Sequence, residues 1–78
     1  MKQYFVYILE CADNLLYTGI TNNLSRRIVE HNAGLNESSF TFRRRPVKLI
    51  FEQDFTDVNQ AIYFEKKLKR WSIGFWRI

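Results

Sequence analysis

The stretch FVYILECADNLLYTG, residues 5–19, contains two β-strand patterns separated by a short polar break. Residues 3–10 (QYFVYILE) carry β-forming residues on both alternating faces, as in a strand that is covered on both sides. Residues 12–14 (ADN) supply turn chemistry, because Asp and Asn accept tight backbone conformations. Residues 15–20 (LLYTGI) provide a second strand. The stretch therefore predicts a β-hairpin.

The register of this hairpin decides whether Tyr7 and Tyr17 lie on the same face. A three-residue loop over 12–14 pairs residue 9 with residue 17 and residue 7 with residue 19, which makes the two tyrosines diagonal neighbours. A two-residue turn puts them on opposite faces, because side chains alternate along a strand with a period of two. The sequence leaves both registers open.

The residues after the hairpin predict a helix, a basic loop and a third strand. Residues 21–23 (TNN) offer helix N-caps, and LSRRIVEHNAG has a helical pattern that ends at Gly34, a favourable C-terminal stop. Residues 35–45 are polar and then basic. Pro46 opens a strand, VKLIFEQDF, whose alternation suits one exposed face.

A second helix is expected near the C-terminal end. Asp57, followed three residues later by a glutamine, marks its start, and the pattern runs through about Trp71. Its apolar stripe consists of Ala61, Phe64, Leu68 and Trp71. Glu65 lies within or beside this stripe and needs a partner or a ligand, because burying a bare carboxylate is costly. The aromatic tail after Ser72 is hard to assign. The order ββαβα indicates a single α+β domain over residues 1–78.

Composition excludes several classes of protein. A chain of 78 residues with 46% hydrophobic and 17% aromatic residues holds one small core and is too apolar for a disordered chain. Its apolar runs are far shorter than the ~18 residues of a membrane span, and we identify no signal peptide before the first strand. We therefore expect a cytoplasmic protein that does not contact a membrane. A single cysteine, Cys11, and a single histidine, His31, exclude an internal disulfide and a cysteine-based zinc site.

The net charge of +4 and the pI near 9.5 favour a polyanionic partner. The basic residues form three clusters, at 26–27, at 43–45 and at 66–70. The residues that we expect to contact a phosphate backbone are Arg26, Arg43, Arg44, Arg45, Lys66, Lys69 and Arg70. The simpler interpretation of each cluster is solvated surface.

Several residues suit the hydrolysis of a phosphodiester. That reaction needs a base for the attacking water, a cation that neutralises charge at phosphorus, and a metal held by a hard oxygen ligand. The candidates are Tyr7 and Tyr17 in the hairpin, Arg27 and His31 on one stripe of the first helix, and Glu65 on the last helix. Each has an ordinary explanation as well, namely core packing for the tyrosines, an ion pair with Glu30 for the arginine, the helix dipole for the histidine, and an ion pair with Lys69 for the glutamate.

From about Tyr4 to Ser72 the chain resembles the GIY-YIG nuclease superfamily, particularly its small stand-alone bacterial members. Phe5-Val6-Tyr7 corresponds to the first signature and Tyr17-Thr18-Gly19 to the second. The segments TNNLSRRIVEHN, RRRPVKLIF and QAIYFEKKLKRWS are similar to the family's later motifs. The resemblance implies a small three-stranded antiparallel sheet flanked by helices, which agrees with the order ββαβα, and it implies cleavage of DNA.

The resemblance also implies a role for each candidate. Tyr7 and Tyr17 match the two signature tyrosines, one of which assists deprotonation of the attacking water. Arg27 matches the arginine that contacts the scissile phosphate, and His31 matches a helix residue that aids proton transfer or orientation. Glu65 matches the single carboxylate that binds the divalent metal, normally Mg²⁺, with Mn²⁺ as a substitute. No organic cofactor is implied.

Gly19 is expected to let the backbone or a phosphate approach closely. Two features depart from the family pattern. Phe5 stands at the position of the first signature's glycine, and the chain ends in IGFWRI where small members usually continue with a basic helix. We expect a truncated or diverged end over 73–78.

These observations predict a Mg²⁺-dependent endonuclease that acts on DNA, in repair or recombination. An alternative from another class is a nucleic-acid-binding module that kept the fold and lost the chemistry. A protein-interaction domain is a third.

Overall fold

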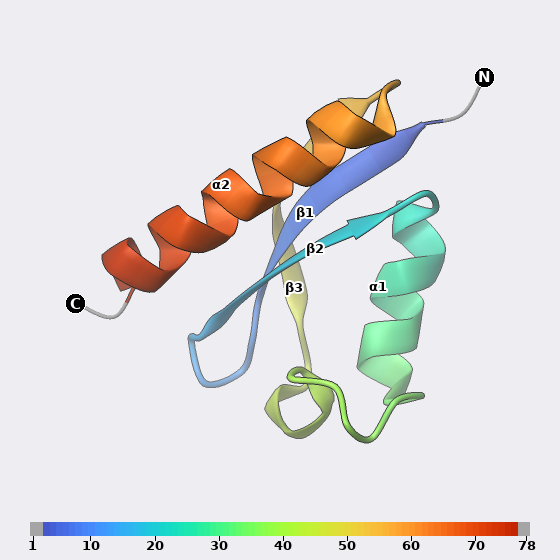
Figure 1. Cartoon of the computed structure of the whole chain (residues 1–78). Helices are drawn as coiled ribbons and strands as arrows, with labels where there is room; N and C mark the ends of the chain where they lie inside the picture. Colours follow the sequence, from blue (N-terminus) through green and yellow to red (C-terminus); the bar gives the residue numbers. More distant parts are fainter. Residues whose placement is uncertain (1–2, 77–78) are drawn as a thin grey trace.

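The computed structural model describes the backbone of residues 3–76 and the side chains of residues 3–70. The elements are the strands β1 (Tyr4–Glu10) and β2 (Leu16–Thr21), the helix α1 (Leu24–Ala33), the short 3-10 helix η1 (Phe42–Arg44), the strand β3 (Lys48–Phe55) and the helix α2 (Val58–Trp76). The strands form one antiparallel sheet in the order β2-β1-β3. The predicted order ββαβα and the three-stranded antiparallel sheet are confirmed (Figure 1).

The hairpin has the register of the three-residue loop over 12–14. Residue 7 pairs with residue 19 and residue 9 pairs with residue 17. Asn14, the last loop residue, has a φ of 69°, a left-handed conformation that Asn tolerates better than most side chains. Tyr7 and Tyr17 therefore lie on the same face of the sheet.

That face carries the main core and packs against α1. Tyr7 and Leu9 of β1 are buried together with Cys11 and Val47. Leu24 and Ile28 of α1 and Leu49 of β3 pack against this group. The two strand tyrosines are thereby placed next to the helix that carries the candidate arginine and histidine.

The opposite face of the sheet packs against α2, which crosses it diagonally (Figure 1). The ring of Phe64 lies 6.2 Å from that of Phe51 and 5.3 Å from that of Phe55, measured between centroids. Ala61 of α2 and Val6 of β1 are fully buried. This second layer fixes the position of α2, and hence of Glu65.

The ends of α1 follow the predicted capping chemistry. The side chain of Asn23 accepts a hydrogen bond from the Arg26 N–H at 3.1 Å. At the other end, Gly34 has a φ of 69°, and its N–H donates to the carbonyls of Glu30 and His31 at 3.1 and 3.3 Å.

Helix α2 continues to Trp76, beyond the expected end near Trp71. Ser72 and Gly74 have low helix propensity, which is why the sequence predicted an earlier end of the helix. No proline follows Ser72 to stop it. The side chain of Trp71, which we expected in the apolar stripe, and residues 77–78 of the tail lie outside the described residues. Within residues 3–76 neither helix has the length and apolar character needed to cross a membrane.

Candidate active site

Three rings meet where the hairpin faces α1. The centroid of Tyr7 lies 6.3 Å from that of Tyr17 and 6.1 Å from that of His31, and the Tyr17 and His31 centroids are 5.2 Å apart. Tyr7 is 1% exposed, whereas Tyr17 and His31 are half-buried. Tyr7 thus lies beneath the other two rings, which keep access to solvent.

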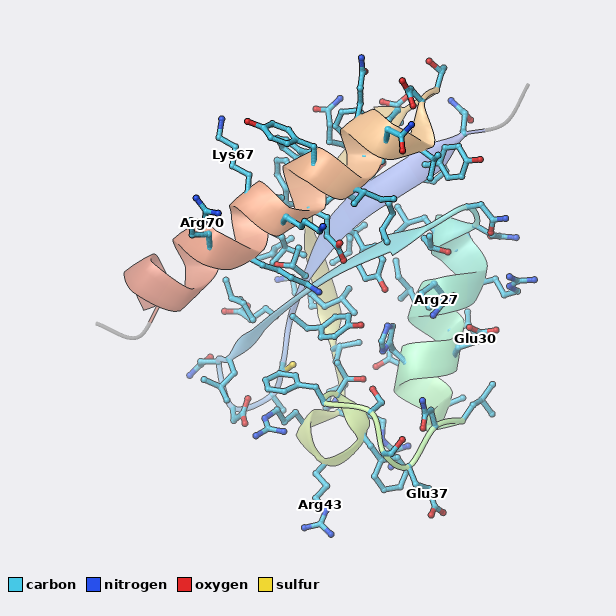
Figure 2. The ribbon with its side chains drawn as sticks, viewed as in Figure 1. Arg27, Glu30, Glu37, Arg43, Lys67 and Arg70 are labelled. Atoms are coloured by element: carbon cyan, nitrogen blue, oxygen red, sulfur yellow. The ribbon has the colours of Figure 1, made fainter. Side chains whose placement is uncertain are left out.

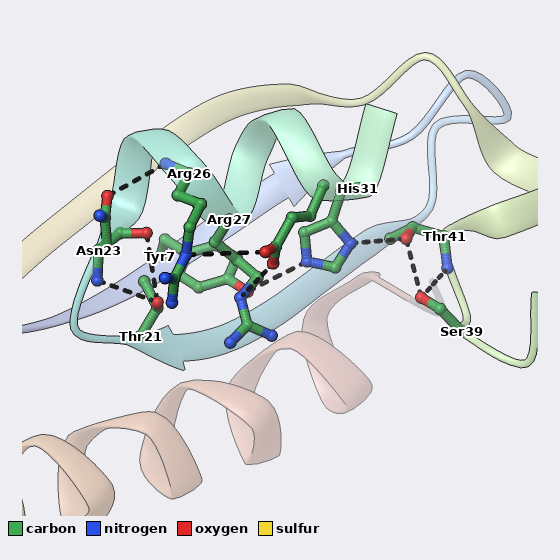
Figure 3. Close-up of polar contacts among 9 residues, drawn as sticks. Tyr7, Thr21, Asn23, Arg26, Arg27, His31, Ser39 and Thr41 are labelled. Atoms are coloured by element: carbon green, nitrogen blue, oxygen red, sulfur yellow. Dashed lines mark hydrogen bonds and ion pairs between the residues drawn. The ribbon is translucent and has the colours of Figure 1, made fainter. Parts of the chain in front are cut away.

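A chain of hydrogen-bonding groups runs through the histidine (Figure 3). The phenol oxygen of Tyr7 lies 3.2 Å from Nε2 of His31, and Nδ1 of the same ring lies 2.7 Å from Oγ1 of Thr41. Oγ1 of Thr41 is in turn 3.0 Å from Oγ of Ser39. The strand tyrosine is therefore connected through the imidazole to the loop that follows α1.

The protonation states of these groups follow from their burial. Burial is the largest cause that raises the pKa of the Tyr7 phenol, and Tyr17 raises it further, so Tyr7 is a neutral phenol at pH 7. Burial also lowers the pKa of His31, with Arg27 as the second cause. His31 is therefore a neutral imidazole at pH 7, with one donor and one acceptor nitrogen.

Arg27 lines a cleft beside these rings. The cleft has a volume of about 360 Å³, and its walls include Tyr17, Arg27, Glu30 and His31. The carboxylate of Glu30 lies 3.5 Å from Nε of Arg27. That Nε is buried and makes no hydrogen bond to any described residue. This Nε is shielded from solvent, but the Arg27 side chain as a whole is 41% exposed, and an anion is the natural partner of a cation in such a cleft.

Glu65 lies on α2 and does not line the cleft. Its side chain is 14% exposed, and it pairs with Nζ of Lys69 at 3.3 Å. After burial and Tyr17, the Glu65 carboxylate is one of the charges that raise the pKa of Tyr7, so it lies within electrostatic reach of the phenol. The structure thus brings Tyr7, Tyr17, Arg27 and His31 together, and the charge of Glu65 acts on Tyr7 from α2.

A divalent cation such as Mg²⁺ needs hard oxygen ligands, and Glu65 offers a carboxylate. Within the described part of the chain, no three His, Cys, Asp or Glu residues are grouped to hold a metal. Mg²⁺ is commonly held by one or two carboxylates, with waters and substrate phosphates as its other ligands. The half-buried Glu65 fits that mode, provided that Lys69 moves aside.

Gly19 leaves room for the two tyrosines. A Cβ atom at this position would lie 2.5 Å from Oη of Tyr7 and 3.0 Å from Cε2 of Tyr17, closer than van der Waals contact allows. Gly19 does not have a positive φ, so space rather than backbone conformation demands a glycine here. The expected close approach of a phosphate at Gly19 stays a prediction.

We therefore expect Gly19→Ala to lower the free energy of unfolding by about 1–3 kcal/mol, because the added methyl overpacks a buried site. Urea unfolding followed by fluorescence measures this change. The control is the same substitution in a Tyr7→Leu background, where the ring that occupies this space is gone and the cost should fall. An equal cost in both backgrounds would contradict the explanation.

Two arginines of the basic loop have structural contacts. Nε of Arg44 pairs with Asp13 of the hairpin loop at 3.0 Å, and the Arg44 guanidinium lies 4.2 Å from the Phe40 ring centroid. Arg45 donates to the Phe42 carbonyl at 2.8 Å and lies over the Phe42 ring. These side chains tie the loop to the body of the protein, and their contacts with phosphates stay a prediction.

The other basic candidates point in several directions. Arg26 pairs with Glu30 at 3.6 Å, and Lys69 pairs with Glu65. Figure 2 shows Arg43 projecting from η1 and Arg70 from the outer side of α2, both away from Arg27. Lys66 is exposed on α2. A single ligand that touches the cleft would therefore not meet all of these residues at once.

The sequence did not single out Thr41 or Ser39 as site residues. Thr41 is 1% exposed although it lies in a polar loop, and it is the partner of His31 Nδ1. Phe40, the neighbouring residue, stacks on Tyr17 with the ring centroids 6.1 Å apart. A loop has no hydrophobic period, so nothing in the pattern marks which of its polar side chains turns inward.

A family model described as the GIY-YIG catalytic domain matches residues 3–74. A UPF0213 protein of Desulfotalea psychrophila is 45% identical over 69 residues, and the match covers 88% of this chain and 63% of that relative. This chain therefore spans less than two thirds of that relative's length. A UPF0213 protein of Staphylococcus haemolyticus is 42% identical over 72 residues, with 92% of this chain and 87% of the relative covered.

Two solved structures share the fold. The solution NMR structure of a UPF0213 protein from Bacillus halodurans has a TM-score of 0.55 and 35% identity, covering 87% of this chain and 71% of the other. A solution NMR structure of a protein from E. faecalis has a TM-score of 0.61 and 32% identity, covering 90% of this chain and 74% of the other.

Proposed function

Because the chain belongs to the GIY-YIG catalytic domain family, we propose that it is an endonuclease that hydrolyses DNA phosphodiester bonds with one divalent cation. Mg²⁺ is the proposed metal and Mn²⁺ its substitute, and the proposed setting is DNA repair or recombination in the cytoplasm. The observation that carries the proposal is the Tyr7–His31 contact of 3.2 Å next to a cleft lined by Arg27, whose side chain is 41% exposed.

In this reaction the oxygen of a water molecule forms a bond to phosphorus while one P–O ester bond breaks. Tyr7 is 1% exposed beneath the rings of Tyr17 and His31, so the attacking water has to enter between those two rings; there Tyr7 takes a proton from it as its own phenolic proton passes to Nε2 of His31, which accepts it because the imidazole is neutral. A solvent proton completes the leaving hydroxyl. Tyr17 lines the cleft and orients the phosphate and the water, and Arg27 stabilises the charge that develops on the phosphate oxygens.

Glu65 is the residue that would hold the cation. A divalent cation there supplies charge neutralisation at the phosphodiester and lowers the pKa of water that it binds. The protein's own contribution is a carboxylate that is 14% exposed and is held within electrostatic reach of Tyr7 by the packing of α2 on the sheet.

The test is to incubate the purified chain with labelled duplex, nicked and branched DNA in Mg²⁺, in Mn²⁺ and in EDTA. We expect cleavage with either metal and none in EDTA, because without a cation at Glu65 the negative charge of the phosphodiester is not neutralised there. Separation of the products on a denaturing gel measures cutting. An absence of cleavage of every substrate with both metals would contradict an endonuclease.

A nucleic-acid-binding module without catalysis is the second candidate. The ion pair between Lys69 and Glu65 favours it, because it occupies the carboxylate that the metal needs. Binding that weakens steeply with salt, together with no cutting in any metal, would support this candidate.

A further inference from the structure

We propose that Thr41 is a positioning residue that holds His31 in the tautomer with its proton on Nδ1, so that Nε2 faces Tyr7 as an acceptor. The consequence for catalysis rests on the proposed nuclease function. The tautomer itself is a property of the free protein.

Thr41 is placed firmly enough for this role. Its Oγ1 lies 2.7 Å from Nδ1 of His31, and Thr41 is 1% exposed. Its own backbone N–H donates to Oγ of Ser39 at 3.2 Å, and the N–H of Phe42 donates to the carbonyl of Ser39 at 3.1 Å. These bonds fix the hydroxyl against the imidazole rather than leaving it on a loose loop.

The hydrogen bonds can run in one of two directions. In the first, the Tyr7 hydroxyl donates to Nε2, the Nδ1–H donates to Thr41, and the Thr41 hydroxyl donates to Ser39 at 3.0 Å. In the second, every donor and acceptor is reversed, and the Nε2–H points at the phenol oxygen. The first direction leaves the hydroxyl proton of Ser39 outside the chain, and the second leaves the phenolic proton of Tyr7 outside it.

The chemistry of the Tyr7 phenol favours the first of these two hydrogen-bond directions. The ring withdraws electron density from the oxygen of Tyr7, so a phenol is a better hydrogen-bond donor than acceptor. An imidazole nitrogen is a strong acceptor, and the tautomer of a histidine is set by the bond that its other nitrogen makes. The first direction therefore prevails, and it leaves Nε2 free to take the proton that the proposed reaction sends through Tyr7.

The tautomer can be read by nitrogen NMR of the free chain at neutral pH. His31 is the only histidine, so the two ring nitrogens are assigned without ambiguity. We expect a protonated Nδ1 and a bare Nε2, the reverse of the preference of free histidine. A bare Nδ1 in the wild-type chain would overturn the proposal whether or not the protein cuts DNA.

The matched variants are Thr41→Val, which keeps the shape and removes the hydroxyl, and Thr41→Ser, which keeps the hydroxyl. Thr41→Val should move the proton of His31 to Nε2 and reduce kcat for DNA cleavage by roughly 10- to 100-fold with KM unchanged. Thr41→Ser should retain both properties. An unchanged tautomer in a folded Thr41→Val chain would contradict the role of Thr41, whereas a wild-type chain with the expected tautomer and no cleavage would contradict only the nuclease function.

Discussion

Replacing Arg27 with glutamine is expected to lower kcat for DNA cleavage by roughly 100- to 1,000-fold, the loss that accompanies removal of one donor that stabilises transition-state charge. Its side chain is 41% exposed and lines the cleft next to Tyr17 and His31. Glutamine keeps a polar side chain of shorter reach but carries no charge. Single-turnover cleavage at saturating protein separates this effect from weaker binding.

Arg26 provides the matched control for this substitution. It is the neighbouring residue on α1 and makes the same kind of ion pair, because Oε2 of Glu30 lies 3.6 Å from its Nε. Its side chain is 60% exposed, and it does not line the cleft. Arg26→Gln should weaken the binding of DNA and make that binding less dependent on salt, with a far smaller change in kcat. Equal losses of kcat in the two variants would show that α1 contributes only general positive charge.

The register of the hairpin shows where sequence reasoning about the fold stops. The polar break over 12–14 predicts a turn, but the choice between two loop lengths depends on one backbone conformation, the left-handed φ of 69° at Asn14. That choice decides whether Tyr7 and Tyr17 share a face. Local chemistry placed the strands, and the loop conformation then determined which side chains meet.

The site shows a similar division between local pattern and tertiary contact. The spacing of Arg27 and His31 places them on neighbouring turns of α1, and a sequence displays such a relation directly. The contact from His31 to Thr41 joins a helix to a folded loop, and the ion pair from Arg44 to Asp13 joins that loop to the hairpin. Only the folded chain reveals which of the loop's polar residues serve the site and which hold the loop in place.

Glu65 is the proposed metal ligand, and it lies on a different helix from Arg27 and His31. It lies on α2, which packs on the face of the sheet opposite to α1, yet its charge acts on the phenol of Tyr7. Its partner Lys69 is 53% exposed at the side chain, so a divalent cation has a flexible competitor rather than a buried one. The pair is exposed only at its Lys69 end, and a cation that displaces the ammonium group would take over the neutralisation of the carboxylate.

Glu65→Gln is therefore expected to reduce metal-dependent cleavage by at least about 100-fold, because glutamine keeps the size of the side chain and loses the charge that holds the cation. Titrating Mg²⁺ and Mn²⁺ against the cleavage rate of each protein measures the effect, and the metal concentration for half-maximal rate should rise steeply in the variant. Glu37→Gln is the control, because Glu37 is an exposed carboxylate that projects from the loop after α1, away from α2 (Figure 2). It should cut with the metal dependence of the wild-type chain. If Glu65→Gln cleaves with an unchanged metal requirement, the cation is held elsewhere and Glu65 has no role in the reaction.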